Sequence, residues 1–447
     1  MSENAILKKS NRLISLDAFR GITIAGMILV NNPGSWGAIY PPLGHAKWHG
    51  WTPTDFIFPF FLFIVGVAIV YAFANRQTSG ASTVSLYLKI IKRTVILFAL
   101  GLYLSAFKCI PPTALRVFGS LFLISWALYL IIRYTGMITN KDSFLKILKW
   151  ILTALALLLV LSSLKGVDFT TLRIPGVLQR IAITYCIASV IVLNTGIKGQ
   201  VWFAVALLVI YWLLMKLVPV SGWGAGMLDM IVDPVTHEAH MGNLAWLIDS
   251  NLLAGHTWSG APAAGFDPEG ILSTIPAIAT VLFGVLTAHW LKTGKNDYEK
   301  VSGLFVFGII GLVLGEILGI WFPINKNLWS PSYTIFMGGM ALLFLGMCYW
   351  LIDIRGYKIW SRPFIIFGSN AIAVYTLSGL FARAMIYWWT VPGPDGTPLA
   401  LKTFLYKSYF EPFLAPLNAS LLWAICYVLV WFVFVLILYK KKIFIKI

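Results

Sequence analysis

Twelve apolar runs, each long enough to cross a lipid bilayer as a helix, recur along the 447 residues of this chain. A helix needs about 20 apolar residues to cross a hydrocarbon core of ~30 Å. The runs lie near residues 13–32, 56–74, 90–107, 116–133, 145–163, 174–193, 200–218, 271–290, 301–321, 332–351, 363–388 and 414–438. They predict an all-α polytopic membrane protein with about 12 transmembrane helices (range about 10–12), the count depending most on residues 108–165.

The composition agrees with this prediction. Hydrophobic residues make up 59% of the chain and charged residues 11%, whereas a soluble domain is usually nearer half apolar and a quarter charged. These values exclude a soluble enzyme, a disordered chain and a small disulfide scaffold.

The charges predict how the helices are oriented. With the N-terminus in the cytoplasm, 22 of the 34 Lys and Arg residues fall in cytoplasmic segments. An excess of Lys and Arg marks the cytoplasmic side, so we expect both termini there. The same asymmetry accounts for the net charge of +17, and no nucleic-acid partner is needed to explain it.

We expect one transmembrane domain over residues 1–447. Residues 13–218 hold the N-terminal helices and an outward loop at 33–55, residues 219–270 form the longest outward loop, and residues 271–438 hold the C-terminal helices. The outward loops are the richer in Trp, Gly, Pro, His and acids. Function concentrates in such loops, so the outward face is expected to hold the site.

Metal binding is not expected. His45 and His49 stand four residues apart, and His237 and His240 three apart, spacings that could share a metal on a helix. Both pairs lie in loop sequence rich in Gly and Pro, and the four cysteines are far apart.

Two polar groups border the first outward loop. Asn31 precedes Asn32-Pro33-Gly34, which is ordinary chemistry for a helix end. Asp55 follows Thr52-Pro53, so that Thr52 can cap a helix whose third residue is the acid. His45 has less structural explanation, and a histidine suits proton transfer near neutral pH.

Other polar groups stand within or beside the apolar runs. Asp17 and Arg20 are three apart on the first run and can pair. Gln179, Arg180 and Asn370 fall inside later runs, where polar groups are costly unless they face a partner or a cavity. The segment Asp267-Pro268-Glu269-Gly270 reads as a helix start with Asp267 as the N-cap, and close packing or a ligand would explain Gly270.

In this order, these motifs resemble the heparan-α-glucosaminide N-acetyltransferase family of transmembrane acyltransferases. The resemblance runs from about residue 13 to 385. It is carried by Ser15-Leu16-Asp17-Ala18-Phe19-Arg20-Gly21, Val30-Asn31, the block from His45 to Pro59, Pro175-Gly176-Val177-Leu178-Gln179-Arg180, Asp267-Pro268-Glu269-Gly270, Pro323-Ile324-Asn325-Lys326 with Leu328-Trp329, and Phe367-Gly368-Ser369-Asn370.

The resemblance implies acetyl transfer from cytoplasmic acetyl-CoA, as co-substrate, to an amino sugar across the membrane. It places the active-site histidine at His45, with Asn31 and Asp55 at matching positions. As candidate residues for binding CoA we consider Arg180, Gln179, Arg93, Lys92 and Asn370. As candidate residues for the acceptor sugar we consider Trp48, Asp267, Glu269 and Asp249.

Other interpretations stay open at this stage. Some bacterial relatives are described as N-acetylglucosamine-related transporters, so sugar transport without acyl transfer is the alternative function. His45 could carry the acetyl group or act as a base within one ternary complex. The expected location is a bacterial inner membrane, and the expected partners are a small-molecule or glycan substrate and the lipid bilayer, with a homodimer also considered.

Overall fold

The computed structural model describes residues 13–78, 80, 82–107, 121, 125, 129, 132, 141–164, 168–393 and 395–445. Eleven of the twelve predicted runs coincide with helices, and the run near 116–133 lies largely outside the described residues. The matching helices are α2 (Ile14–Val30), α3 (Ile57–Thr78), α4 (Thr83–Ala106), α7 (Lys141–Leu164), α8 (Val177–Asn194), α9 (Ile197–Leu217), α11 (Thr274–Leu291), α12 (Asp297–Gly319), α13 (Pro331–Cys348), the pair α14 (Arg362–Ser369) and α15 (Ala371–Tyr387), and α17 (Pro416–Lys440).

The chain is a mostly helical, polytopic membrane protein. Among the described residues, seven helices are long and apolar enough to cross a membrane, or eight if α14 and α15 count as one span bent by 80°. The predicted count of about 12 is therefore not reached in the described part of the chain. Two of the predicted spans are not counted for local reasons. The helix α2 has only 17 residues, and the first half of α4 carries three cations, Lys89, Lys92 and Arg93.

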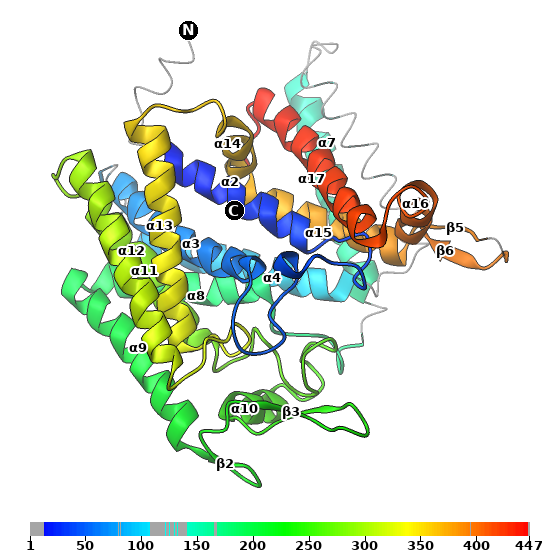
Figure 1. Ribbon diagram of the computed structural model, residues 1–447. Helices are drawn as coiled ribbons and strands as arrows, with labels where there is room; N and C mark the ends of the chain where they lie inside the picture. Colours follow the sequence, from blue (N-terminus) through cyan, green and yellow to red (C-terminus); the bar gives the residue numbers. More distant parts are fainter. Residues whose placement is uncertain are drawn as a thin grey trace.

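The helices pack in pairs around one large apolar core. The most extensive contacts join α12 with α13, α11 with α3, α14 with α2, and α4 with α8. Figure 1 shows α9, α11, α12 and α13 on one side of the bundle and α15, α16 (Leu401–Tyr409) and α17 on the other. Glycines allow α3 and α11 to lie close together, since a Cβ at Gly66 would overlap the Val281 carbonyl and one at Gly284 the Phe63 carbonyl. Small residues commonly have this role between membrane helices.

The longest loops gather at one end of the bundle. Residues 219–270 contain α10 (Leu244–Leu252) and the short strands β1 (Pro219–Val220), β2 (Gly224–Ala225), β3 (Met230–Val232) and β4 (Ala239–Met241), which form two hairpins. Figure 1 shows α10, β2 and β3 beneath the helices. A third hairpin joins β5 (Thr390–Pro392) to β6 (Pro398–Ala400).

Three of these loops pack against one another through a second, smaller apolar cluster. Trp48, from the loop before α3, meets Phe266 edge to face at 6.0 Å between ring centroids, and Leu328 belongs to the same cluster. The backbone N–H of Gly50 donates to the Ile324 carbonyl at 2.7 Å. The loops before α3, α11 and α13 are therefore one packed unit, and that unit carries the candidate site.

Candidate active site

Asp55 is held by the helix start that the sequence predicts. The 3-10 helix η2 (Pro53–Phe56) leads into α3, and Thr52 and Asp55 form a capping box at its start. Asp55 Oδ2 accepts hydrogen bonds from the backbone N–H groups of Thr52 at 3.0 Å and Ala46 at 3.1 Å. The predicted cap is confirmed, and these bonds fix the direction of the carboxylate.

The second oxygen of the same carboxylate holds His45. Asp55 Oδ1 lies 2.7 Å from His45 Nδ1. A carboxylate only accepts hydrogen bonds, so Nδ1 of a neutral imidazole carries the proton and the lone pair is on Nε2. The Asp55 side chain is fully buried, whereas that of His45 is 48% exposed. Asp55 is therefore both a helix cap and the residue that sets the tautomer of His45.

Lys326 completes this group from a distant part of the chain. Its Nζ lies 2.9 Å from His45 Nδ1 and 3.1 Å from Nε2, and 3.5 Å from Asp55 Oδ1. Burial lowers the pKa of the Lys326 ammonium, while the negative charges of Asp55 and Glu269 act in the opposite direction and only partly offset it. The sequence interpretation did not single out Lys326, although its segment Pro323-Ile324-Asn325-Lys326 was among those that carried the family resemblance.

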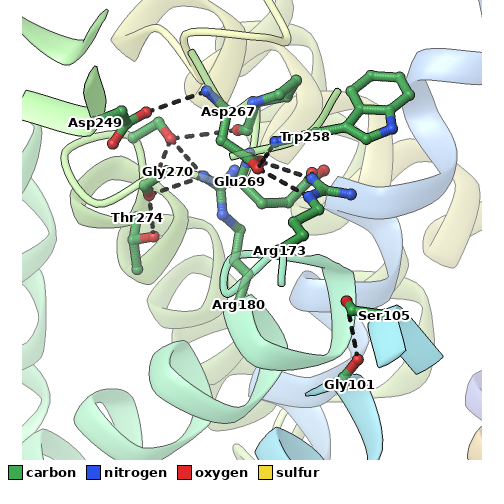
Figure 2. Close-up of polar contacts among 12 residues, drawn as sticks. Gly101, Ser105, Arg173, Arg180, Asp249, Trp258, Asp267, Glu269, Gly270 and Thr274 are labelled. Atoms are coloured by element: carbon green, nitrogen blue, oxygen red, sulfur yellow. Dashed lines mark hydrogen bonds and ion pairs between the residues drawn. The ribbon is translucent and has the colours of Figure 1, made fainter. Parts of the chain in front are cut away.

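A second charged cluster lies between α8 and α11, and Figure 2 shows its residues. Arg173 binds Asp267 through two hydrogen bonds, Nε to Oδ2 at 2.8 Å and Nη2 to Oδ1 at 2.7 Å. Nη2 also donates to Glu269 Oε2 at 2.6 Å. Burial raises the pKa of the Glu269 carboxyl, but the charges of Arg173, Arg180 and Lys326 outweigh it and leave the pKa below its usual value. Glu269 is therefore an anion at neutral pH.

Asp249, on α10, lies on the side of this cluster opposite Arg173 (Figure 2). It accepts hydrogen bonds from the backbone N–H groups of Asp267 at 3.3 Å and Ile271 at 3.0 Å. Burial raises the pKa of Asp249 to about 6. A Cβ at Gly270 would overlap its carboxylate, which is the close packing that explains this glycine.

The predicted helix start at Asp267 is wrong. α11 begins at Thr274 with Ser273 as its N-cap residue, and residues 267–270 form a turn closed by the N–H of Gly270 on the Asp267 carbonyl at 2.8 Å. The Asp267 side chain accepts a cap-like hydrogen bond from the Glu269 N–H at 2.9 Å, but it also binds Arg173 and the backbone N–H of Trp258, and the chain forms a turn here instead of a helix.

The two charged groups meet at a cavity of about 220 Å³. His45, Asn31, Lys326, Glu269 and Arg173 all line it. Trp258 also lines it, with its ring 5.4 Å from the Arg173 guanidinium carbon. The deeper wall comes from helices and consists of Met27, Val30, Ile57, Phe58, Val177 and Tyr375. Asn31 is the exposed C-cap residue of α2, so its capping role and its place at the cavity coexist.

Several candidate residues do not line this cavity. Trp48 is buried and donates from Nε1 to the Leu228 carbonyl at 3.0 Å, while Asp249 and Asp267 shape the loop. Arg180 is 1% exposed and donates to Ser273 Oγ and the Gly270 carbonyl, with its guanidinium carbon 5.1 Å from the Trp329 ring. This placement makes Arg180 a support of the 267–273 turn, while its Nε and Nη1 have no hydrogen-bond partner among the described residues, and its role in binding CoA stays a prediction.

The remaining candidate CoA residues are spread along the bundle. Gln179 is buried beside Gly101. The Arg93 guanidinium lies 4.5 Å from the centroid of the Tyr185 ring, and Lys92 is exposed. Asn370 stands at the break between α14 and α15 and binds the C-terminal segment, accepting from the Ile445 N–H at 2.8 Å and donating to the Ile443 carbonyl at 3.1 Å. Their role in binding CoA stays a prediction.

The predicted pair at the start of the chain does form. Arg20 Nη1 lies 3.2 Å from Asp17 Oδ1. His49 lies four residues after His45 in the same loop. Its Nε2 binds Asp229 at 2.8 Å, and it does not share a site with His45.

Comparison with known proteins shows what this chain is similar to. Residues 12–171 match the family described as heparan-alpha-glucosaminide N-acetyltransferase, catalytic. The chain is 26% identical over 478 aligned residues to the heparan-alpha-glucosaminide N-acetyltransferase of Mus musculus and 27% identical over 475 to that of Homo sapiens. Each alignment covers 98% of this chain but only 61% and 60% of the relatives, so the chain spans about three fifths of their length.

Residues 12–171 include Asn31, His45 and Asp55. The charged partners Lys326, Arg173 and Glu269 lie beyond that segment, within the part covered by the longer alignments. Residues 12–171 therefore carry a match to the heparan-alpha-glucosaminide N-acetyltransferase catalytic family, and nearly the whole chain shows distant homology to these transferases.

Proposed function

We propose that this protein transfers an acetyl group from cytoplasmic acetyl-CoA to the amine of a glucosamine-type sugar on the outer side of a bacterial cytoplasmic membrane. One observation carries the proposal. His45, with Nδ1 fixed by Asp55, faces a cavity that an anionic glutamate also lines. A lone pair on Nε2 is the group that either an acetyl carrier or a general base needs.

The chemistry needs one proton acceptor and one good leaving group. The sugar amine attacks the thioester carbonyl, its N–H proton passes to His45 Nε2, the C–S bond breaks, and the CoA thiolate takes up the proton. In the two-step alternative, Nε2 first attacks the thioester and releases the CoA thiolate. The amine then attacks the acetyl carbonyl, the bond between Nε2 and the acetyl carbon breaks, and the freed Nε2 takes up the amine proton. Both routes use the same lone pair, so Lys326 must move away from Nε2 when an amine enters.

The acceptor end of the cavity suits a cationic amino sugar. Glu269 offers a negative charge to the ammonium form of the sugar, which releases one proton to water before the neutral amine attacks. Trp258 offers an aromatic face on which a sugar ring can stack. Arg173 holds Glu269 in place through a 2.6 Å ion pair. Of the four acceptor candidates from the sequence, we therefore propose Glu269 for direct contact, with Asp267 and Asp249 shaping its loop and Trp48 holding the neighbouring loop.

The donor must reach the same cavity from the opposite side of the membrane. The cavity wall formed by Met27, Phe58, Val177 and Tyr375 is mostly apolar, which suits a pantetheine arm. We propose that the CoA phosphates stay near the cytoplasmic ends of the helices, where Lys92 and Arg93 of α4 supply cations.

The test uses purified protein in sealed liposomes. Acetyl-CoA labelled in the acetyl group is supplied on one side, glucosamine on the other, and the product is identified by mass spectrometry. We expect N-acetylglucosamine to form on the glucosamine side only. Movement of unmodified sugar with no acetylated product would favour the transport alternative, and acetylation of hydroxyl groups alone would contradict the amine assignment.

Acid quenching within the first turnover separates the two routes. A label retained on His45 after quenching indicates the two-step route, whereas its absence during steady turnover indicates direct transfer.

A further inference from the structure

A second cavity lies far from His45, on the lipid-facing side of α9, α11, α12 and α13. It is an apolar groove of about 520 Å³. Val201 of α9, Leu286 of α11, Ile310 of α12 and Leu342 of α13 are among the residues that line it. Figure 1 shows these four helices together on one side of the bundle. The acetyl-transfer mechanism proposed above does not use this groove.

The groove leads into a more polar chamber of about 250 Å³ at one end of the bundle. The two share Ile197 and His289 as lining residues. The chamber adds Thr195, Gln200 and Lys292. It lies where α3, α8 and α11 end and α9 begins, which the distribution of Lys and Arg predicts to be the cytoplasmic side.

Two polar atoms at the chamber have no hydrogen-bond partner in the described part of the chain. Gln200 is 2% exposed and donates from Nε2 to the Thr195 carbonyl at 3.1 Å, but its Oε1 accepts no hydrogen bond among the described residues. His289 Nε2 is likewise buried without a partner in the described chain. Buried polar atoms are rarely left unpaired without reason, so these two atoms indicate a ligand.

The charge of the chamber indicates what kind of ligand. Lys292 supplies a cation, with its Nζ 6.0 Å from the Tyr71 ring centroid, and the described residues that line the chamber include no Asp or Glu. The chamber therefore suits an anion that also carries a hydrogen-bond donor for Gln200 Oε1. The adjoining groove suits a hydrocarbon chain, since its lining is almost entirely apolar.

The length of the groove matches one leaflet of a bilayer. On and just beyond α11 its lining runs from Phe283 to Thr293, two residues past the end of the helix at Leu291. At a rise of about 1.5 Å per residue this is roughly 15 Å, about half of a hydrocarbon core of ~30 Å.

We propose that groove and chamber together bind one anionic phospholipid of the cytoplasmic leaflet whose headgroup carries hydroxyl groups. One acyl chain lies in the groove, the phosphate meets Lys292 and His289, and a headgroup hydroxyl donates to Gln200 Oε1. The helix α11 runs from the 267–273 turn, which contains Glu269, to this chamber. The bound lipid therefore restrains the end of α11 that lies farthest from the turn.

The experiment uses the full-length protein and phosphatidylglycerol as the probe. Protein in phosphatidylcholine nanodiscs receives increasing phosphatidylglycerol, and lipid retained after mild detergent extraction is counted by native mass spectrometry. We expect one phosphatidylglycerol retained per chain and no comparable retention of phosphatidylcholine.

Two pairs of variants test the two parts of the site. Val201→Trp fills the groove, whereas Val205→Trp, one turn away on α9, does not line it. The two valines are 42% and 47% exposed, so the substitutions perturb the lipid face of α9 to a similar extent. Lys292→Gln removes the chamber cation, and Lys198→Gln removes an exposed cation at the same end.

We expect Lys292→Gln to weaken retention about tenfold, near the lower end of the scale of one hydrogen bond to a charged group. We expect Val201→Trp to weaken it about tenfold as well, the scale of displacing about two buried methylene groups of the acyl chain, and the two control variants to leave it within about twofold. Equal effects within either pair, equal retention of both lipids, or displacement of the lipid by CoA would overturn the proposal. Acetyl transfer measured separately shows whether the proposed function fails independently of this site.

Discussion

Lys326 Nζ lies 3.1 Å from His45 Nε2, although 281 residues separate the two in sequence. The contact exists because the loop before α13 packs on the loop before α3, with the Gly50 N–H donating to the Ile324 carbonyl at 2.7 Å. The candidate active site is therefore assembled from both halves of the chain, and neither half contains it alone.

Replacing His45 tests the reactive atom. We expect His45→Ala to lower acetyl transfer by at least about 10²-fold, the smaller end of what a general acid or base contributes, while the protein still inserts and folds. His49→Ala is the matched control, because its ring binds Asp229 and Asn325 and does not line the cavity. Turnover measured with labelled acetyl-CoA checks this, and equal loss in both variants would show that the loop, not the imidazole, was damaged.

Asp55 has two roles that different substitutions separate. Asp55→Asn removes the acceptor charge that fixes the His45 tautomer, so we expect a large fall in kcat. Thr52→Ala weakens the same helix cap without removing the carboxylate, and we expect it to lower the free energy of unfolding by about 1 kcal/mol with kcat nearly unchanged. Kinetics and thermal unfolding of the two variants provide the measurement. A similar fall in kcat for both would mean that Asp55 acts only through the cap.

Lys326 is expected to hold the pair of His45 and Asp55 in place. Its Nζ lies 2.9 Å from His45 Nδ1 and 3.5 Å from Asp55 Oδ1. We expect Lys326→Met to lower kcat/KM, because the buried Asp55 carboxylate loses a cationic neighbour, and Lys326→Arg to keep more of the activity because it retains the charge. Turnover of Lys326→Met equal to that of the parent protein would contradict a role for this lysine in the site.

Asp249 makes stability depend on pH in a direction that can be worked out. Its pKa is raised from 3.8 to about 6 by burial in the folded protein, so between those values the folded state binds more protons than the unfolded state. Stability from this group is then present at low pH and falls as pH rises from about 4 to 6.

The isosteric variant measures this effect. Asp249→Asn cannot ionise, so its stability should lack this pH dependence. Compared with the variant, the parent protein should lose up to about 3 kcal/mol of its free energy of unfolding as pH rises from about 4 to 6. Midpoints of thermal unfolding for both proteins from pH 4 to 7, in one detergent, provide the measurement. Parallel curves would show that the carboxyl is not perturbed by burial.

The sequence alone determined several features of this protein, because they depend on interactions between residues that are close in the chain. Apolar runs of sufficient length form helices because backbone polar groups must be paired inside a membrane, and eleven of the twelve runs are helices. The capping box of Thr52 and Asp55 and the pair Asp17–Arg20 form within three residues, so spacing is enough to predict them. The family resemblance was confirmed, and it pointed to His45 and Asn31, which the structure places at one cavity.

Only the tertiary structure decided which distant groups meet. The spacing between Arg173 and Glu269, or between His45 and Lys326, contains no information about contact, because loop packing sets those distances. The same packing engages Asp267 with Arg173, and α11 starts at Thr274 instead of directly after Asp267. It also bends the predicted run at 363–388 by 80° at Asn370, where the side chain binds the C-terminal segment. Charged groups are costly to bury unless they are paired, so the fold brings these residues together, and their positions follow from the folded chain as a whole.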